Sequence, residues 1–114
     1  MDCLFCKIIQ GDVPAAKVYE DEFVCAFNDI KKAAKHHILI IPKVHICNAN
    51  RIDNENSLYV AKIFETAAKI ADQLGFAQEG YRVITNCGPQ VGQTVFHLHF
   101  HLLSGPEISP DRII

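Results

Sequence analysis

The sequence lacks a long apolar run, an excess of basic residues and a signal-like start, and each absence excludes a class of protein. No apolar run approaches the roughly 20 residues that a membrane-spanning helix needs. Eleven lysines and arginines stand against thirteen aspartates and glutamates, a formal charge of −2. Without a basic patch, nucleic acid is not the expected partner, and we expect no membrane contact either.

The cysteines do not follow a secreted disulfide framework, because there are five of them and their spacing is irregular. The first residues also lack the basic start and long apolar core of a signal peptide. Both observations favour reduced thiols and a cytoplasmic location. A length of 114 residues fits one compact domain over residues 1–114.

Apolar periodicity predicts an α+β fold with a mostly antiparallel sheet of five strands, one short helix and one long helix. Asp53 or Asn54 can cap the start of the long helix, and Gly75 follows its last apolar position. The tail, residues 104–114, has little predicted regular structure. The helices are expected at 3–9 and from about 55 to 74, and the strands at 17–20, 23–27, 37–41, 81–86 and 96–103.

The last predicted strand carries the most informative pattern: His97, Leu98, His99, Phe100, His101 and Leu102. Because a strand alternates its side chains between two faces, the three imidazoles share one face and the apolar residues share the other. A polar strand face and a metal site made by the row itself are alternatives. Catalysis at phosphorus is favoured, because imidazole is a good nucleophile near neutral pH and needs no separate base.

The loop before this strand supports chemistry on a phosphate. Gly88 and Gly92 allow the backbone to approach a ligand closely, and their amides could cradle a phosphate. Gln93 and Thr94 add an amide and a hydroxyl that could stabilise charge on phosphoryl oxygens. A plain hairpin loop explains the glycines equally well when they are taken alone.

Residues 92–103, GQTVFHLHFHLL, resemble the signature of the histidine-triad (HIT) superfamily, His-φ-His-φ-His-φ-φ, in which φ is apolar. Residues 5–9, 26–30, 37–45 and 80–83 are similar to the Hint branch, so the resemblance covers nearly the whole chain. It implies an α+β fold whose sheet continues across a homodimer. It also implies a site for nucleoside 5′-monophosphates.

The resemblance implies a role for each histidine of the site. His99 would attack the α-phosphorus and form a nucleotidylated enzyme, which water then hydrolyses. His101 and His37 would contact the phosphoryl oxygens and the leaving-group side, and His97 would support the row. No catalytic metal is expected.

The resemblance also implies a nucleotide-binding set. Asp29 would hold the ribose hydroxyls and Phe27 would line the base pocket, although a turn residue and a core residue are the plainer interpretations. The phosphate region would be contacted by Asn86, Gln93 and Thr94, beside the backbone of Gly92.

Cys3 and Cys6 form a Cys-x-x-Cys pair, a spacing that suits zinc or redox chemistry. With His45 and His97 the pair could complete a Cys₂His₂ set. Several family members with this pair bind structural zinc at equivalent positions, so the resemblance implies a structural zinc ion here. Inert buried thiols and a redox pair are the alternatives.

The substrates that the resemblance implies are purine nucleoside 5′-phosphoramidates, such as adenylated amines. Dinucleoside polyphosphate hydrolysis, a nucleotide-binding regulatory or scaffold role, and a zinc-centred interaction module are the alternatives. The tail departs from the Hint pattern, because Ser104-Gly105 replaces the usual Gly-Gly and the chain has no tryptophan. In the family this segment shapes selectivity for the leaving group.

Overall fold

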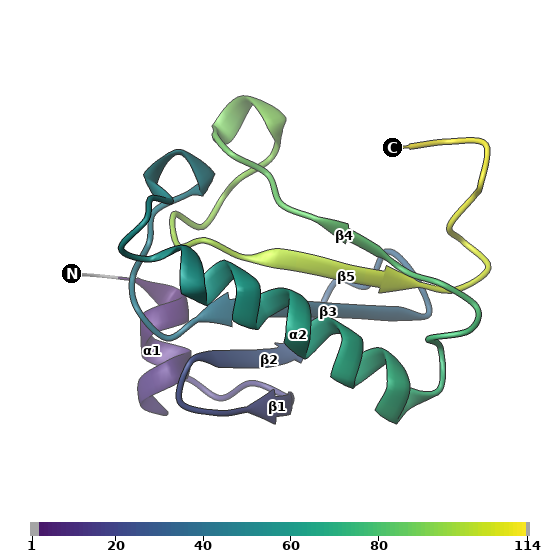
Figure 1. The fold of residues 1–114 in the computed structure, drawn as a ribbon, viewed down its shortest axis with the longest axis horizontal. Coiled ribbons are helices and arrows are strands. Elements are labelled where there is room, and N and C mark those ends of the chain that lie inside the picture. The colour runs from purple at the N-terminus through teal and green to yellow at the C-terminus, as the bar shows by residue number, and fades with distance from the viewer. Residues whose placement is uncertain (1–2, 114) are drawn as a thin grey trace.

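The computed structural model describes residues 3–113, so the ends of the predicted domain, residues 1–2 and 114, lie outside it. It confirms the predicted α+β class, with a five-stranded sheet, a short helix and a long one (Figure 1). Two single 3₁₀ turns, Ala49–Arg51 and Pro89–Val91, were not predicted. The elements are α1 Leu4–Gln10, β1 Lys17–Glu20, β2 Val24–Asn28, β3 His36–Pro42, α2 Ser57–Leu74, β4 Arg82–Ile84 and β5 Phe100–Ser104.

The sheet has the strand order β1-β2-β3-β5-β4, and every neighbouring pair is antiparallel. The long helix α2 crosses one face of the sheet (Figure 1). Side chains from α2 and from alternate strand positions form the larger core, whereas α1 packs on the intervening positions of β2 and β3. Alternation along the strands therefore gives the sheet two covered faces, one per helix.

The apolar face of α2 is formed by residues at helical spacing. Ile63, Ala67, Ile70 and Ala71 are buried there, and none is more than 1% exposed. Gly75 ends the helix in the left-handed conformation at φ 83°, and its N–H donates to Ala71 O, as predicted for a glycine at this position. Within residues 3–113, no helix has the length and apolar character needed to cross a membrane.

The predicted start of α2 is wrong, because the helix begins at Ser57 rather than near residue 55. Asp53 does not cap it; Asp53 Oδ1 instead accepts the N–H groups of Glu55 and Asn56 and closes a separate turn. Asn56 occupies the cap position, but its side chain bonds Asp53 and Arg51 backbone atoms in the preceding turn. Asn54, the other predicted cap, also falls inside this turn.

The last strand is shorter than predicted, since β5 begins at Phe100 rather than at residue 96. Pairing with β3 ends at Ile40, opposite Phe100, and the segment before β5 bonds a loop instead, with Leu98 N–H donating to Ile46 O at 2.6 Å. The predicted alternation still holds, because Leu98 packs in the α2 core and His97 and His99 contact α1.

The other bounds differ by small amounts. The strand predicted at 81–86 is only three residues long, β4, whereas β1 matches its predicted range. The predicted ranges of α1, β2 and β3 are displaced or shortened by one residue at their ends, as is usual where helices and strands fray. Residues 105–113 contain no helix or strand, in agreement with the prediction for the tail.

Candidate active site and metal centre

A pocket of about 660 Å³ lies between α1, the end of β2 and the glycine-bearing loop. Apolar side chains from α1 and residues 13–16 form much of its wall. Most of the residues predicted for catalysis and nucleotide binding line it, although they come from four separate parts of the chain. These residues are Phe27, Asp29, Asn86, Gly92, Thr94, His99 and His101.

His99 is held with one ring nitrogen free. Its Nδ1 lies 2.8 Å from the carbonyl oxygen of His97, which can only accept, so Nδ1 carries the proton. Nε2 therefore keeps its lone pair. Thr85 Oγ1 donates to the His99 carbonyl at 2.8 Å and fixes the backbone at this position. His99 lines the pocket at 8% exposure, so it presents a nucleophilic nitrogen in a largely desolvated site.

A chain of hydrogen bonds sets the tautomers of His37 and His101. The Ala33 N–H donates to His37 Nδ1 at 3.0 Å, so the proton of a neutral His37 is on Nε2. That Nε2 lies 2.8 Å from His101 Nδ1, which must accept. His101 therefore carries its proton on Nε2, as a donor beside His99. His37 supports the site through His101 and does not itself line the pocket.

Burial keeps both of these histidines neutral. Desolvation, with a smaller contribution from the neighbouring imidazoles of His99 and His37, lowers the pKa of His101 to about 4. Burial also lowers the pKa of His37, although the Asp29 carboxylate, 3.4 Å from His37 Nε2, works in the opposite direction. Hydrogen-bond donation from a neutral imidazole, rather than a fixed positive charge, is what His101 offers here.

Asp29 is a turn residue and Phe27 is a core residue, and both also line the pocket. Asp29 Oδ1 accepts the Lys31 N–H at 2.9 Å in a turn after β2, and Phe27 is buried at 4% exposure. Both nevertheless line the pocket, where the Phe27 ring meets the edge of Phe5 at 5.6 Å between centroids. An apolar ring and a carboxylate in the lining of one pocket suit a nucleoside base and its ribose.

Gln93 is placed behind the pocket rather than in its lining. Its Oε1 accepts the Gly88 N–H at 2.9 Å, and its Nε2 donates to the carbonyls of Cys47 and Val95. Gly88 and Gly92 have φ of 108° and 100°, which favours glycine. Gln93 thus braces the glycine-bearing loop, and contact between its side chain and a phosphate stays a prediction.

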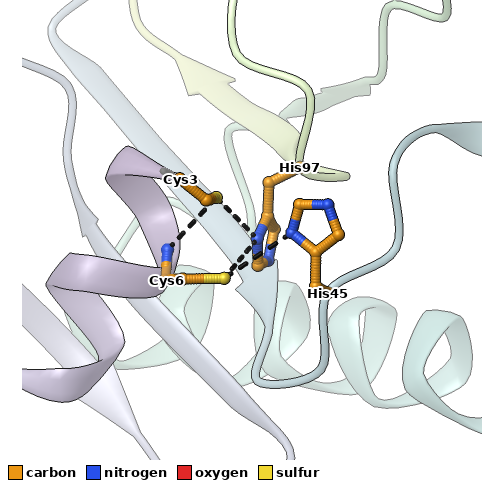
Figure 2. Close-up of side chains that lie close together, drawn as sticks. All are labelled: Cys3, Cys6, His45 and His97. Atoms are coloured by element: carbon orange, nitrogen blue, oxygen red, sulfur yellow. Dashed lines mark hydrogen bonds between the residues drawn. The ribbon is translucent and has the colours of Figure 1, made fainter. Parts of the chain in front are cut away.

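The predicted Cys₂His₂ set is brought together beside the start of α1 (Figure 2). Cys3 and Cys6 come from α1 and its N-cap, His45 from the loop after β3, and His97 from the segment before β5. Cys3 Sγ lies 3.4 Å from His97 Nδ1, and Cys6 Sγ lies 3.6 Å from Nδ1 of both His45 and His97. All four ligand atoms lie within 4.8 Å of one another.

The donor set fits a tetrahedral zinc ion. Zn–S bonds of about 2.3 Å and Zn–N bonds of about 2.0 Å give sulfur–nitrogen edges of roughly 3.5 Å, as observed. His97 Nε2 donates to Pro42 O at 3.0 Å, which leaves the Nδ1 lone pair for the metal. Burial lowers the pKa of His97 and so favours its neutral, metal-binding form. His97 is fully buried and belongs to this group, not to the pocket lining.

The sequence did not indicate the wall that α1 contributes. Leu4, Phe5 and Ile8 line the pocket, and the Phe5 ring contacts His99 at 5.1 Å between centroids. Phe5 and His99 are more than ninety residues apart in the sequence, so no local sequence pattern predicts that they pack together. The bond from the Ala33 N–H that fixes the tautomer of His37 also could not be predicted from the sequence, because its donor is a backbone group of a loop.

The low pKa of His101 predicts an acid-sensitive step in stability. Below about pH 6.5, His101 binds a proton in the unfolded chain but stays neutral in the folded protein. The stability that its low pKa contributes is therefore fully present above that pH and is lost as the pH falls toward 4. We expect His101→Asn to reduce the loss between about pH 7.5 and about pH 5 by on the order of 2 kcal/mol. Urea unfolding of both proteins at the two pH values measures this; equal losses would contradict the prediction.

The comparisons with known proteins agree on one family. The HIT domain family model matches residues 10–108. A purine nucleoside phosphoramidase from Escherichia coli K12 is 42% identical over 109 residues, which are 96% of this chain and 92% of that protein. A HIT family hydrolase from Clostridium thermocellum superposes with a TM-score of 0.95 at 50% identity, covering 99% of this chain and 97% of its own. A histidine triad protein from Clostridium difficile gives 0.91 at 47% identity, over 96% and 95%. The chain therefore belongs to the HIT domain family and is a hydrolase, as the resemblance implied.

Proposed function

We propose that this chain hydrolyses purine nucleoside 5′-phosphoramidates to nucleoside monophosphates through a nucleotidyl intermediate on His99. The observation that carries the proposal is the free Nε2 of His99 in a pocket that also holds Asp29 and Phe27. Similarity to a purine nucleoside phosphoramidase over 96% of the chain supports the choice of substrate.

In the first step, the Nε2 lone pair of His99 attacks the α-phosphorus. The bond between phosphorus and His99 forms as the bond between phosphorus and the amine breaks, and the amine nitrogen takes up a proton from solvent so that it leaves as a neutral amine. His101 Nε2–H donates to a phosphoryl oxygen, since its other nitrogen is occupied by His37. Thr94 and Gly92 line the same pocket.

In the second step, water attacks the same phosphorus and breaks its bond to His99. This releases the nucleoside monophosphate and restores the neutral imidazole, whose Nδ1–H still donates to the His97 carbonyl. The proton lost by the attacking water passes to solvent and balances the proton that the amine takes up in the first step, while Nε2 of His99 regains its lone pair. Both steps use only groups of this chain that line the pocket, and we expect no catalytic metal.

We further propose that Cys3, Cys6, His45 and His97 hold a structural zinc ion. The ion would fix the first turn of α1 to the two segments that carry the histidines (Figure 2). A bound cation there supplies folding free energy rather than chemistry at phosphorus. The homodimer with a continuous sheet, the single domain over residues 1–114 and the cytoplasmic location stay predictions.

The proposed function is tested by incubating the wild-type protein with adenosine 5′-phosphoramidate in the presence of a chelator. At saturating substrate, where lower nucleotide affinity does not limit the rate, we expect release of AMP and ammonia at a rate that a chelator added only for the assay leaves unchanged. A diadenosine polyphosphate is offered in parallel. Faster cleavage of the polyphosphate would favour the alternative substrate, and binding of AMP without cleavage of either would favour a regulatory or scaffold role.

A further inference from the structure

Helix α1 takes part in both the metal centre and the nucleotide pocket. Its N-cap residue Cys3 accepts the N–H of Cys6 at 3.4 Å, so both sulfurs belong to the first turn. Its side chains Leu4, Phe5 and Ile8 line the pocket. A helix of seven residues has little stability of its own, so its position depends on what it packs against and on what its first turn binds.

The Phe5 side chain contacts residues of both sites. Its ring meets His97 edge-on with centroids 5.9 Å apart, and it meets the nucleophile His99 in the same way at 5.1 Å. A third edge contact at 5.6 Å reaches Phe27, in the wall expected to hold the base. Phe5 is only 5% exposed, and a close-packed ring cannot shift without moving its neighbours.

A second link is a wall that the two sites share. Another pocket, of about 410 Å³, is lined by Cys3 and His45 of the metal group. Leu4, Thr94 and Val95 line this pocket and also the nucleotide pocket. The segment before the histidine row and the first turn of α1 therefore separate the sites, and an adjustment on one side reaches the other.

We propose that metal binding at Cys3, Cys6, His45 and His97 and nucleotide binding in the pocket strengthen each other through α1. A metal ion holds the first turn where Phe5 and Leu4 complete the pocket wall. A nucleotide against that wall holds α1, and with it both sulfurs, in the position that the metal needs. This inference rests on the proposed function and on the zinc proposal. Because coupling between two binding sites is reciprocal, each ligand raises the affinity of the other by the same factor.

The test measures zinc binding and does not depend on catalytic turnover. Release of zinc from the wild-type protein to a chromogenic chelator is recorded with and without saturating AMP; His45 is exposed, so a chelator can reach the site. At equilibrium with the chelator, we expect AMP to raise the affinity of the protein for zinc by roughly fivefold or more, a typical coupling factor. Calorimetric titration of zinc-loaded and chelator-stripped protein should show AMP affinity falling by a similar factor on metal removal.

Two phenylalanine variants separate coupling from general destabilisation. Phe5→Leu keeps an apolar wall but loses the ring edges toward His97 and His99, so we expect full zinc content with a coupling factor clearly below that of the wild-type protein. Phe64→Leu is the matched control, because Phe64 is half exposed on α2 and contacts Phe100 in the other core. It should keep the wild-type coupling factor.

Three outcomes would overturn the inference: no zinc bound after loading, no AMP bound, or both bound with neither affecting the other. The loss of AMP binding would also defeat the proposed function. Coupled binding of zinc and AMP by a protein that leaves adenosine 5′-phosphoramidate intact would instead sustain the inference and defeat only the hydrolase proposal.

Discussion

Replacement of His99 by alanine is expected to lower the rate of phosphoramidate hydrolysis by at least about 10³-fold, which corresponds to about 4 kcal/mol of transition-state stabilisation. The variant removes the nitrogen whose lone pair is left free by the bond between Nδ1 and the His97 carbonyl. None of the neighbouring imidazoles can replace it, because His37 and His101 bond each other and His97 faces the sulfurs. Initial rates of AMP release measure the effect.

His36→Ala is the matched control for this variant. His36 is the residue before His37, but its ring stacks on Phe76 at 4.6 Å between centroids, in the core on the α2 face. We expect it to keep a rate within a fewfold of wild type. His99→Ala must still bind AMP and unfold cooperatively; a well-folded His99→Ala protein with near wild-type turnover would exclude His99 as the nucleophile.

Loss of the metal centre is expected to have the largest effect on stability. Serine at both Cys3 and Cys6 should abolish zinc binding and lower the free energy of unfolding by roughly 4 kcal/mol, the amount supplied by a ligand at a thousand times its dissociation constant. For a domain of this size, that lowers the melting temperature by more than about 10 °C. Zinc content by elemental analysis and thermal unfolding by circular dichroism measure both.

Cys87→Ser serves as the cysteine control, because Cys87 is half-buried and lies outside the four-residue group. It should retain one zinc ion per chain and the wild-type melting temperature to within a few degrees. Chelator treatment of the wild-type protein should reproduce the double variant. The zinc proposal would be contradicted if the double variant had the melting temperature of the wild-type protein, or if the wild-type protein took up no zinc. Cys3 and Cys6 would then be inert thiols.

The fold and most of the site could be predicted because they depend on local patterns. The period of two in the histidine row places His99 and His101 on the face opposite Leu98 and Phe100, and this holds even where the regular strand has not begun. The metal group could be anticipated in the same way, since the cysteine pair and the family resemblance supplied its members.

What the sequence could not show depends on contacts between distant segments. The amide of Gln93 looks like a phosphate ligand beside Thr94, and the sequence does not show that it also bonds three backbone groups, two in the glycine-bearing segment and one, the Cys47 carbonyl, in the loop after β3. His97 belongs to the same row as the nucleophile, but its ring is committed to the sulfurs and to the Pro42 carbonyl. The start of α2 was misplaced because Asp53 closes a turn with the same kind of bond that caps a helix.

The most direct test of the account is to trap the covalent intermediate. Wild-type protein is mixed with adenosine 5′-phosphoramidate, quenched in alkaline denaturant to protect the phosphorus–nitrogen bond, and analysed by mass spectrometry. The account predicts one adenylyl group on the peptide that contains His99, absent in His99→Ala and removed as AMP accumulates. Rapid turnover without an adduct would contradict it, as would inversion of configuration when the substrate is made stereogenic at phosphorus with oxygen isotopes, because water would then attack the substrate directly.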